Sequence, residues 1–178
     1  MKSAVEQLAT YKSVHLNPSN IKTHFVGVPL IIWSIMLLCS LVRLPVDVPL
    51  LGNSLTLAAC LTLVVVTYYF VLHIPLAVGM SVFMGICLYL AHIVSLHPLA
   101  LEIALAVFVI AWVVQFIGHH YEKAKPAFID DLNQLFIGPL FLMAEVYFMV
   151  GWQKPLEDEI TPIARDLRRA LEKKRKGE

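Results

Sequence analysis

The sequence predicts an all-α, multi-pass membrane protein with about four transmembrane helices, a broken or re-entrant fifth apolar segment and amphipathic helices at both ends. Of its 178 residues, 58% are hydrophobic and 15% are charged, whereas soluble domains carry roughly 25% charged residues. The mean hydropathy is +0.73. Between Phe25 and Gln115 the charged side chains are Arg43, Asp47 and Glu102. Such segregation of charge toward the ends of a chain is typical of membrane proteins.

The overall charge and the cysteines exclude several other classes. A formal net charge of +1 provides no electrostatic field for binding nucleic acid, so we expect no nucleic-acid partner. The three cysteines lie inside apolar runs without CxxC spacing, which argues against a disulfide framework and a thiolate metal site. The polar N-terminus lacks the apolar stretch of a cleavable signal, so we expect it to persist in the mature protein.

The first element is predicted to be a short surface helix over residues 3–13. Ser3 and Glu6 form a capping-box pattern, and a narrow apolar stripe follows them. Pro18 cannot continue that helix but suits the first position of a new one, with Asn17 as its cap. A second helix is therefore expected to begin near Pro18.

Four apolar segments have about the length needed to cross a hydrocarbon core roughly 30 Å thick. They cover residues 25–42, 55–72, 76–91 and 99–117. A proline-punctuated loop is expected at 44–49, and a tight hairpin at His73-Ile74-Pro75 joins the second and third segments.

The fifth apolar segment, residues 135–152, is less regular. It contains Gly138-Pro139 and Glu145, which are costly in a helix that faces lipid. Beyond it, Thr161 is predicted to cap a basic amphipathic helix that begins at Pro162 and suits an anionic membrane surface.

Lysine and arginine placement predicts the orientation. Basic residues precede the first span, follow the fourth and fill the tail, whereas the loops after the first and third spans hold only Arg43. Both termini and the 118–134 segment are therefore expected to be cytoplasmic. We expect one membrane domain over 1–178, with an N-terminal segment at 1–23, a membrane core at 24–152 and a tail at 153–178. It would reside in the inner membrane of a bacterium or the endoplasmic reticulum of a eukaryote.

Five of the seven histidines are predicted to lie at the cytoplasmic surface. They are His15, His24, His119, His120 and, in the short hairpin, His73. Neutral imidazoles suit a first-row transition metal, and the spacing places Asn20 beside His24 and His119 beside Glu122 on shared helix faces. An interfacial position alone also explains any single histidine, and for His73, His92 and His97 we prefer that interpretation.

Several other polar residues are candidates for the same site. Glu145 is a functional candidate because it is a carboxylate within an apolar segment, although it could equally cap that segment or pair with a histidine nitrogen. Tyr121, Lys123 and Lys125 could hold a carboxylate head group, but a short basic cytoplasmic loop also explains them.

Two sequence motifs and a later pair resemble a known family, the small multi-pass membrane 2-hydroxy fatty acid dioxygenases. The resemblance covers nearly the whole chain and rests on these patterns: Tyr11-x3-His15-x-Asn17-Pro18-x-Asn20-x3-His24-x2-Gly27-x-Pro29, Gln115-Phe116-Ile117-Gly118-His119-His120-Tyr121-Glu122-Lys123-x-Lys125-Pro126-Ala127, and Gly138-Pro139-x5-Glu145.

The resemblance implies an Fe(II)-dependent enzyme that uses O2 to shorten a 2-hydroxy fatty acid by one carbon at the lipid bilayer. It points to His15, His24 and His119 as iron ligands, with His120 as a ligand or a neighbour. Glu122 would orient a ligand or cap its helix. From the residues and the resemblance together, Glu122, Tyr121 and Glu145 are assigned to catalysis, and Asn20, Lys123 and Lys125 to substrate binding.

Two alternatives remain open at this point. A zinc-dependent membrane hydrolase would also use histidines and a nearby glutamate, but the chain lacks an HExxH motif. A non-catalytic scaffold or transporter is the other alternative. Transport is disfavoured because spans two to four have almost no polar residues and no inverted repeat is visible.

Overall fold

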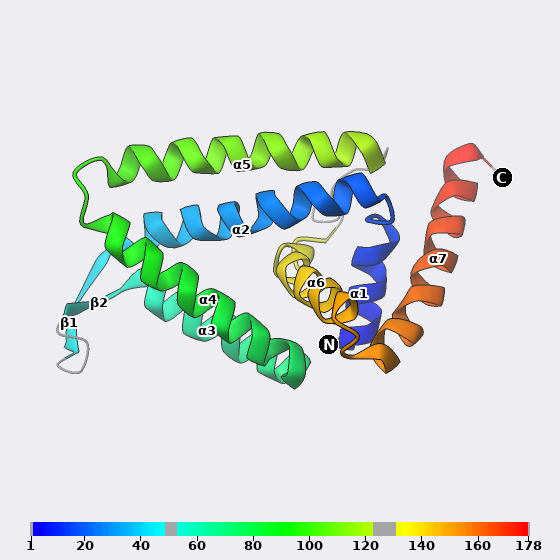
Figure 1. Ribbon diagram of the computed structural model, residues 1–178, viewed down its shortest axis with the longest axis horizontal. Helices are drawn as coiled ribbons and strands as arrows, with labels where there is room; N and C mark the ends of the chain where they lie inside the picture. Colours follow the sequence, from blue (N-terminus) through cyan, green and yellow to red (C-terminus); the bar gives the residue numbers. More distant parts are fainter. Residues whose placement is uncertain (1, 49–52, 123–130, 178) are drawn as a thin grey trace. The chain divides into compact units, whose positions relative to one another are not determined.

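The computed structural model describes residues 2–48, 53–122 and 131–177 and is predominantly α-helical (Figure 1). Its elements are α1 Ala4–Ser13, α2 Pro18–Ser40, β1 Arg43–Val48, β2 Asn53–Thr56, α3 Leu57–Leu72, α4 Ile74–Ser95, α5 Ala100–Glu122, α6 Gln134–Met149 and α7 Lys154–Lys176. The predicted all-α membrane class is confirmed. The chain divides into two compact units: a first unit of residues 1–25 and 115–178, and a second unit of residues 26–114.

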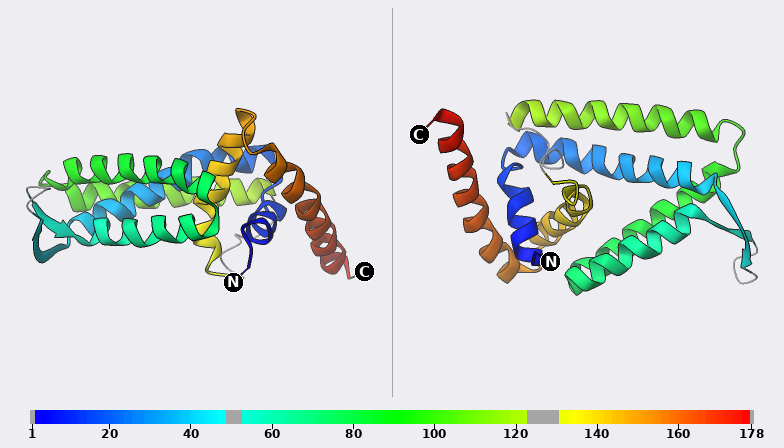
Figure 2. Two further views of the ribbon diagram at one scale, coloured as in Figure 1. Left: turned by 90° about the horizontal axis from the view of Figure 1, so that it is seen from below. Right: turned by 180° about the vertical axis from the view of Figure 1, so that it is seen from behind.

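Helix α1 forms the centre of the first unit. The predicted capping box is confirmed, because the Glu6 backbone N–H donates to Ser3 Oγ (3.2 Å) and the Ser3 N–H donates to the Glu6 carboxylate (2.8 Å). The prediction of a surface helix was wrong. Leu8 and Ala9 are fully buried, since α1 packs against both α6 and α7 (Figures 1 and 2).

Helix α2 begins at Pro18 as predicted, and Asn17 caps it by accepting a hydrogen bond from the Ser19 N–H (2.8 Å). The short stretch between α1 and α2 carries His15. Because Pro18 already fits the first helical turn, the chain can end one helix and begin the next within four residues.

Helix α7 begins at Lys154, seven residues before the predicted cap at Thr161, so that prediction was wrong. Gln153 adopts a left-handed conformation (φ 54°) and Pro155 lies in the first turn. Pro162 then lies inside the helix, where a proline costs roughly 3 kcal/mol. Burial of Ile160 and Ala164, both fully inaccessible, offsets that cost.

Helix α6 is a 16-residue helix that contains Pro139. Seven of its residues are buried, and six of these lie within the range 135–152 that was expected to be broken or re-entrant. The expectation that this segment packs against protein is thus confirmed, and the packing compensates for the backbone hydrogen bond that Pro139 cannot make.

The second unit contains a two-stranded antiparallel hairpin, β1 and β2, where the sequence analysis predicted only a loop. Its pairing is irregular between Arg43 and Asp47, around Pro45, which has no N–H to donate. The missed signal is the alternation of Leu44, Val46 and Val48 with polar residues or proline, the two-residue period of a strand.

Helices α3 and α4 lie side by side as an antiparallel pair (Figure 2). His73 joins them as predicted. It ends α3 and caps α4, with its ring Nδ1 accepting from the Leu76 N–H (3.4 Å).

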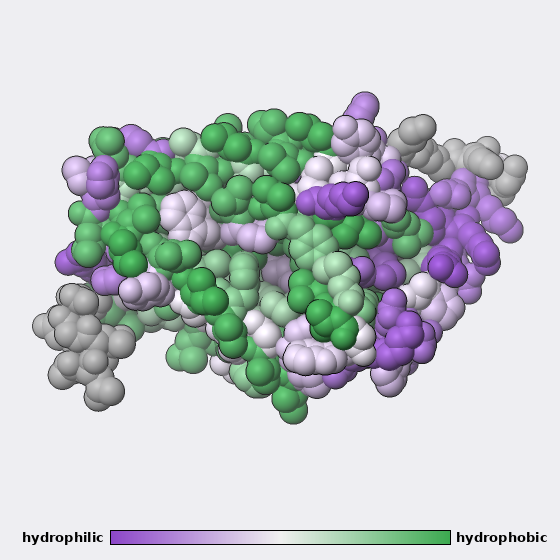
Figure 3. Space-filling model, viewed as in Figure 1, coloured by the Kyte–Doolittle hydropathy of each residue, from purple (hydrophilic) through white to green (hydrophobic). Residues whose placement is uncertain are grey.

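In the described parts of the chain, three helices are long and apolar enough to cross a membrane: α2, α4 and α5. Helices α3 and α6 are also apolar but shorter. Figure 3 shows hydrophobic side chains over α5 and hydrophilic ones over α7. The protein is therefore a helical membrane protein with a polar C-terminal helix.

Candidate metal centre

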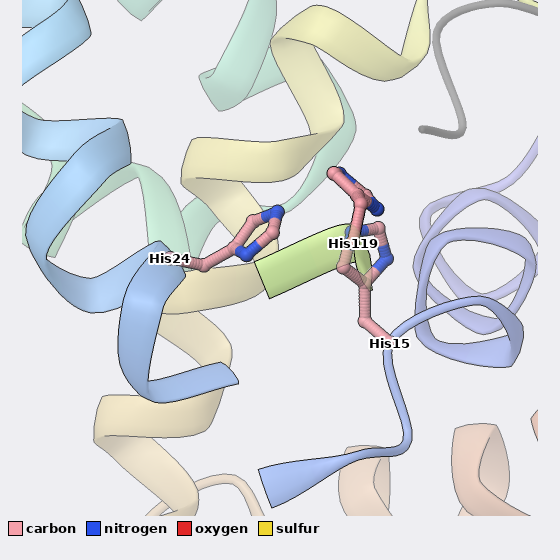
Figure 4. A group of neighbouring side chains, drawn as sticks. All are labelled: His15, His24 and His119. Carbon is pink, nitrogen blue, oxygen red and sulfur yellow. The ribbon is translucent and has the colours of Figure 1, made fainter. Parts of the chain in front are cut away.

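Three histidines from three separate stretches converge within the first unit. His15 precedes α2, His24 lies on α2 and His119 lies on α5 (Figure 4). Their ring centroids are 4.7 to 5.2 Å apart, and one nitrogen of each lies within 4.8 Å of the others. His15 and His24 are buried, and His119 is half-buried.

Backbone carbonyls fix the orientation of two of these rings. His15 Nδ1–H donates to the Tyr11 carbonyl (2.7 Å), and His24 Nδ1–H donates to the Asn20 carbonyl (2.9 Å). A carbonyl only accepts, so each Nδ1 carries the proton and Nε2 keeps its lone pair. This arrangement is typical of metal-bound histidines, whose other nitrogen is held by a carbonyl or carboxylate.

Tyr11 supports the His15 ring from one side. The centroids of the two stacked rings are 4.0 Å apart, with an interplanar angle of 2°. The ring centroid of Phe141 on α6 lies 5.1 Å from that of Tyr11. A Cβ on Gly138 would lie 2.8 Å from the Tyr11 hydroxyl. Gly138 thus gives Tyr11 the room to lie beneath His15, which explains the Gly-Pro pair as a packing feature.

Burial favours the neutral form of His15. Desolvation, together with the neighbouring His24, holds the pKa of His15 well below its usual value of 6.5. Burial also raises the pKa of the Tyr11 phenol. A neutral imidazole is the form that binds a metal.

The residues present fit a transition metal. His15 Nε2 is buried and makes no hydrogen bond in the described structure, which is costly unless a ligand occupies it. Three imidazole nitrogens suit iron, zinc or copper rather than magnesium or calcium. Metal–imidazole bonds are about 2.1 Å long. Because the three nitrogens already lie within 4.8 Å of one another, the rings need only a small inward movement to bind one metal ion.

Glu122 is buried beside the histidines, with its side chain 1% exposed. Its carboxylate accepts four hydrogen bonds, two on each oxygen: Leu16 N–H (3.3 Å) and Arg168 Nη1 (3.0 Å) on Oε1, and Asn17 N–H (2.8 Å) and Asn20 Nδ2 (3.1 Å) on Oε2. Both oxygens are engaged by protein donors. Glu122 therefore fastens the stretch that carries His15 to the end of α5.

Arg168 extends this connection to α7. Besides its ion pair with Glu122, it donates to the Glu122 carbonyl (3.3 Å) and pairs with Glu172 (2.7 Å). Arg168 was not among the predicted site residues, because it lies 46 positions from Glu122 and no local pattern links the two.

The structure places the remaining candidates as follows. His120 is exposed and outside the three-histidine group. Tyr121 is 52% exposed, and its carbonyl accepts from Asn17 Nδ2 (3.0 Å). Asn20 is buried, with its amide nitrogen on Glu122. Lys123 and Lys125 lie outside the described residues.

Glu145 pairs with a lysine. Lys12 Nζ lies 2.6 Å from Glu145 Oε1, and the two side chains are only 12% and 17% exposed. Lys12 also lies over the rings of Phe141 and Phe148, at 5.7 and 5.6 Å. No local pattern links these two residues, which are 133 positions apart. The pair joins α1 to α6.

Breaking the Lys12–Glu145 pair on one side is expected to destabilise the protein. Lys12→Met leaves a largely buried carboxylate without its counter-ion, which costs roughly 3 kcal/mol, whereas Lys12→Met with Glu145→Met removes both charges and recovers most of the loss. Thermal unfolding of the detergent-purified protein measures this. Asp166→Ala, which breaks the exposed ion pair with Arg169, is the control, and its unfolding temperature should differ little from that of wild type. Equal unfolding of Lys12→Met and wild type would contradict the prediction.

Gly118 permits the close contact of α5 with the start of α2. A Cβ there would lie 2.0 Å from Thr23 Oγ1 and 2.6 Å from Asn20 Oδ1. We expect Gly118→Ala to destabilise by about 1–3 kcal/mol through overpacking, and Thr23→Ala to restore part of that loss in the double variant. Thermal unfolding of the three variants measures these changes in stability. Gly85→Ala is the matched control because open space surrounds that helical glycine. A loss of stability in Gly85→Ala as large as in Gly118→Ala would refute the packing explanation.

The fold and this site together define a helical membrane protein with a buried three-histidine group that can hold a metal ion. Comparison with known proteins identifies the family. The chain belongs to the Mpo1-like family, described as 2-hydroxy-palmitic acid dioxygenase Mpo1-like, whose model matches residues 1–150. The 2-hydroxy-palmitic acid dioxygenase MPO1 of Saccharomyces cerevisiae is 35% identical over 153 residues, covering 85% of this chain and 83% of the relative. No solved structure matches the chain.

Proposed function

We propose that this protein is an Fe(II)-dependent dioxygenase that converts a 2-hydroxy long-chain fatty acid to the fatty acid one carbon shorter. The observation that carries the proposal is the buried group of His15, His24 and His119 in a chain whose yeast relative is named a 2-hydroxy-palmitic acid dioxygenase.

The proposed reaction balances with O2 as the oxidant. The bond between C1 and C2 breaks, the carboxyl carbon leaves as CO2, and C2 is oxidised from a secondary alcohol to a carboxylic acid. That oxidation releases four electrons, which reduce O2: one oxygen atom enters the new carboxyl group and the other leaves as water. The substrate and O2 therefore suffice, without a further reductant.

Iron is the metal that this reaction favours. When bound, Fe(II) would supply the one-electron chemistry that side chains lack and that O2 requires, whereas zinc has no redox activity. Three imidazoles leave coordination positions open, as in other non-haem iron sites. The chain provides these three ligands and holds two of them in the required tautomer through the carbonyls of Tyr11 and Asn20.

We assign the remaining residues by their contacts. Glu122 is a positioning residue, since four donors occupy its oxygens. Glu145 neutralises Lys12 between α1 and α6. Asn20, whose Oδ1 is buried and makes no hydrogen bond in the described structure, contacts the polar head of the substrate. Lys123, Lys125 and Tyr121 attract its carboxylate, and His120 lies near the site without ligating the metal.

The site is proposed to lie at the cytoplasmic membrane interface of a multi-pass protein. His24 precedes the apolar run of α2, and His119 follows that of α5. A fatty acid can then keep its tail in hydrocarbon while its head reaches the histidines. The distribution of lysine and arginine supports cytoplasmic termini, in the bacterial inner membrane or the endoplasmic reticulum.

The test loads the detergent-purified protein with Fe(II) without air, then adds 2-hydroxypalmitic acid and O2. We expect mass spectrometry to detect pentadecanoic acid and CO2, and prior treatment with a chelator to abolish both. Absence of these products from protein with stoichiometric iron would refute the proposed reaction. Zinc-loaded protein is the control for the hydrolase alternative and should form no product.

A further inference from the structure

A glutamine on α5 is buried without a partner. Gln115 is 3% exposed, and neither its Nε2 nor its Oε1 makes a hydrogen bond in the described part of the structure. A buried amide with both ends unsatisfied is destabilising relative to a paired one, because each polar group loses its hydrogen bonds to water without replacement. Native proteins contain few such groups, and each calls for a physical explanation, such as a catalytic role or an ion or water in the site.

The position of Gln115 directs it to the candidate metal centre. It lies four residues before His119, so the two share a face of α5, separated by about 6 Å along the helix axis. Ala111, Gly118 and Glu122 are buried on the same side, whereas Phe116 and Ile117 are exposed. Gly118 on this face abuts Asn20, whose Oδ1 is also buried and without a hydrogen bond in the described residues.

From this geometry we infer that Gln115 binds the head of the substrate and selects for its 2-hydroxyl group. This inference rests on the proposed function. An amide offers one acceptor and a two-proton donor side by side. A 2-hydroxy acid presents the complement: its hydroxyl donates to Oε1, and its carboxylate accepts from Nε2. A fatty acid without the hydroxyl leaves Oε1 buried and unpaired, and a site built around a hydroxyl rejects such an analogue strongly.

The test uses metal-free protein, because a bound metal would itself prefer a 2-hydroxy acid. Dissociation constants of 2-hydroxypalmitic and palmitic acid are measured by competition against a fluorescent fatty acid in one detergent. We expect wild type to bind 2-hydroxypalmitic acid at least about 10-fold more tightly, and Gln115→Met to reduce that ratio to near one. The ratio is independent of the folded fraction, because both acids report on the same molecules.

Two further measurements separate this role from a structural one. Gln134 is a second buried glutamine in the first unit, 2% exposed, with its Nε2 3.5 Å from Asp131. Gln134→Met is the matched control and should keep the wild-type ratio of dissociation constants. Because both variants are measured in the same detergent, this control also corrects for unequal partition of the two acids into detergent. Gln115→Met is expected to unfold at the same or a higher temperature than wild type, since it removes an unpaired amide. If it does not fold, Gln115→Asn takes its place and should also lower the ratio.

The outcomes are distinct. A wild-type ratio near one, or a Gln115 variant that keeps the wild-type ratio, overturns the inference about Gln115. Neither result affects the proposed reaction while iron-loaded wild type still forms pentadecanoic acid. Loss of that product with an intact binding ratio would refute the reaction and leave Gln115 as a binding residue for the 2-hydroxy head group.

Discussion

His119→Ala is expected to abolish stoichiometric metal binding and to lower dioxygenase activity by more than about 100-fold. Residues that only support a ligand already change metal affinity by about 10- to 100-fold, and His119 supplies one of three nitrogens that lie within 4.8 Å of each other. With two imidazoles left, the site can hold a metal only weakly. Metal content after anaerobic loading and desalting measures the first effect, and product formation measures the second.

The adjacent residue provides a matched control. His120 is exposed and outside the three-histidine group, so His120→Ala should keep one metal per chain and activity within about 2-fold of wild type, because no coordinate bond is lost. His24→Ala should behave like His119→Ala. If His120→Ala lost its metal while His119→Ala retained it, the ligand assignment would be wrong.

Local sequence patterns predicted several elements of the fold. The capping box at Ser3, the start of α2 at Pro18 and the role of His73 between two helices each depend on residues within a few positions of one another. Helical spacing and the orientation of the spans also suggested that His15, His24 and His119 lie at one surface. Such features follow from propensity and charge placement, which act over short distances along the chain.

The supporting contacts of the site could not be predicted in this way. Lys12 meets Glu145 and Arg168 meets Glu122 only because α1, α6 and α7 pack together. The same packing buries α1, whose narrow apolar stripe had suggested a surface helix. At α7, burial of Ile160 outweighed the cost of Pro162, so the helix begins earlier than its proline suggests. Tertiary burial decided each of these cases, and periodicity alone does not report it.

Glu122 shows how these long-range contacts serve the site. Its four hydrogen bonds tie the residues after His15, the first turn of α2 and the tail helix to the end of α5. Arg168 comes from α7, beyond the residues 1–150 that the family model matches. The His15 position thus depends on a carboxylate that does not itself belong to the metal group.

Glu122→Gln is expected to lower metal affinity and activity together. Each carboxylate oxygen accepts from two donors, so whichever way the new amide turns, its NH2 faces two donors and leaves them unsatisfied, at about 1–3 kcal/mol for each buried group. Glu122→Ala removes all four acceptor contacts, and Arg168 keeps its ion pair with Glu172. We expect a loss of about 3 kcal/mol in unfolding free energy, because several donors around the site lose their acceptor. Metal titration, thermal unfolding and product formation are measured on each variant.

Metal affinity distinguishes a positioning residue from a catalytic base at Glu122. If Glu122 is a catalytic base, the Glu122→Gln variant keeps wild-type metal affinity and stability but has no turnover. If Glu122 is a positioning residue, its substitution lowers metal affinity first, because His15 is held less firmly. A high metal concentration then restores part of the activity. Arg168→Met provides an independent check: it removes one donor and the counter-ion from Glu122 without touching the histidines, so it should weaken metal binding in the same direction. Wild-type metal affinity in both Glu122→Gln and Arg168→Met would show that the connection from α7 to Glu122 does not hold the site.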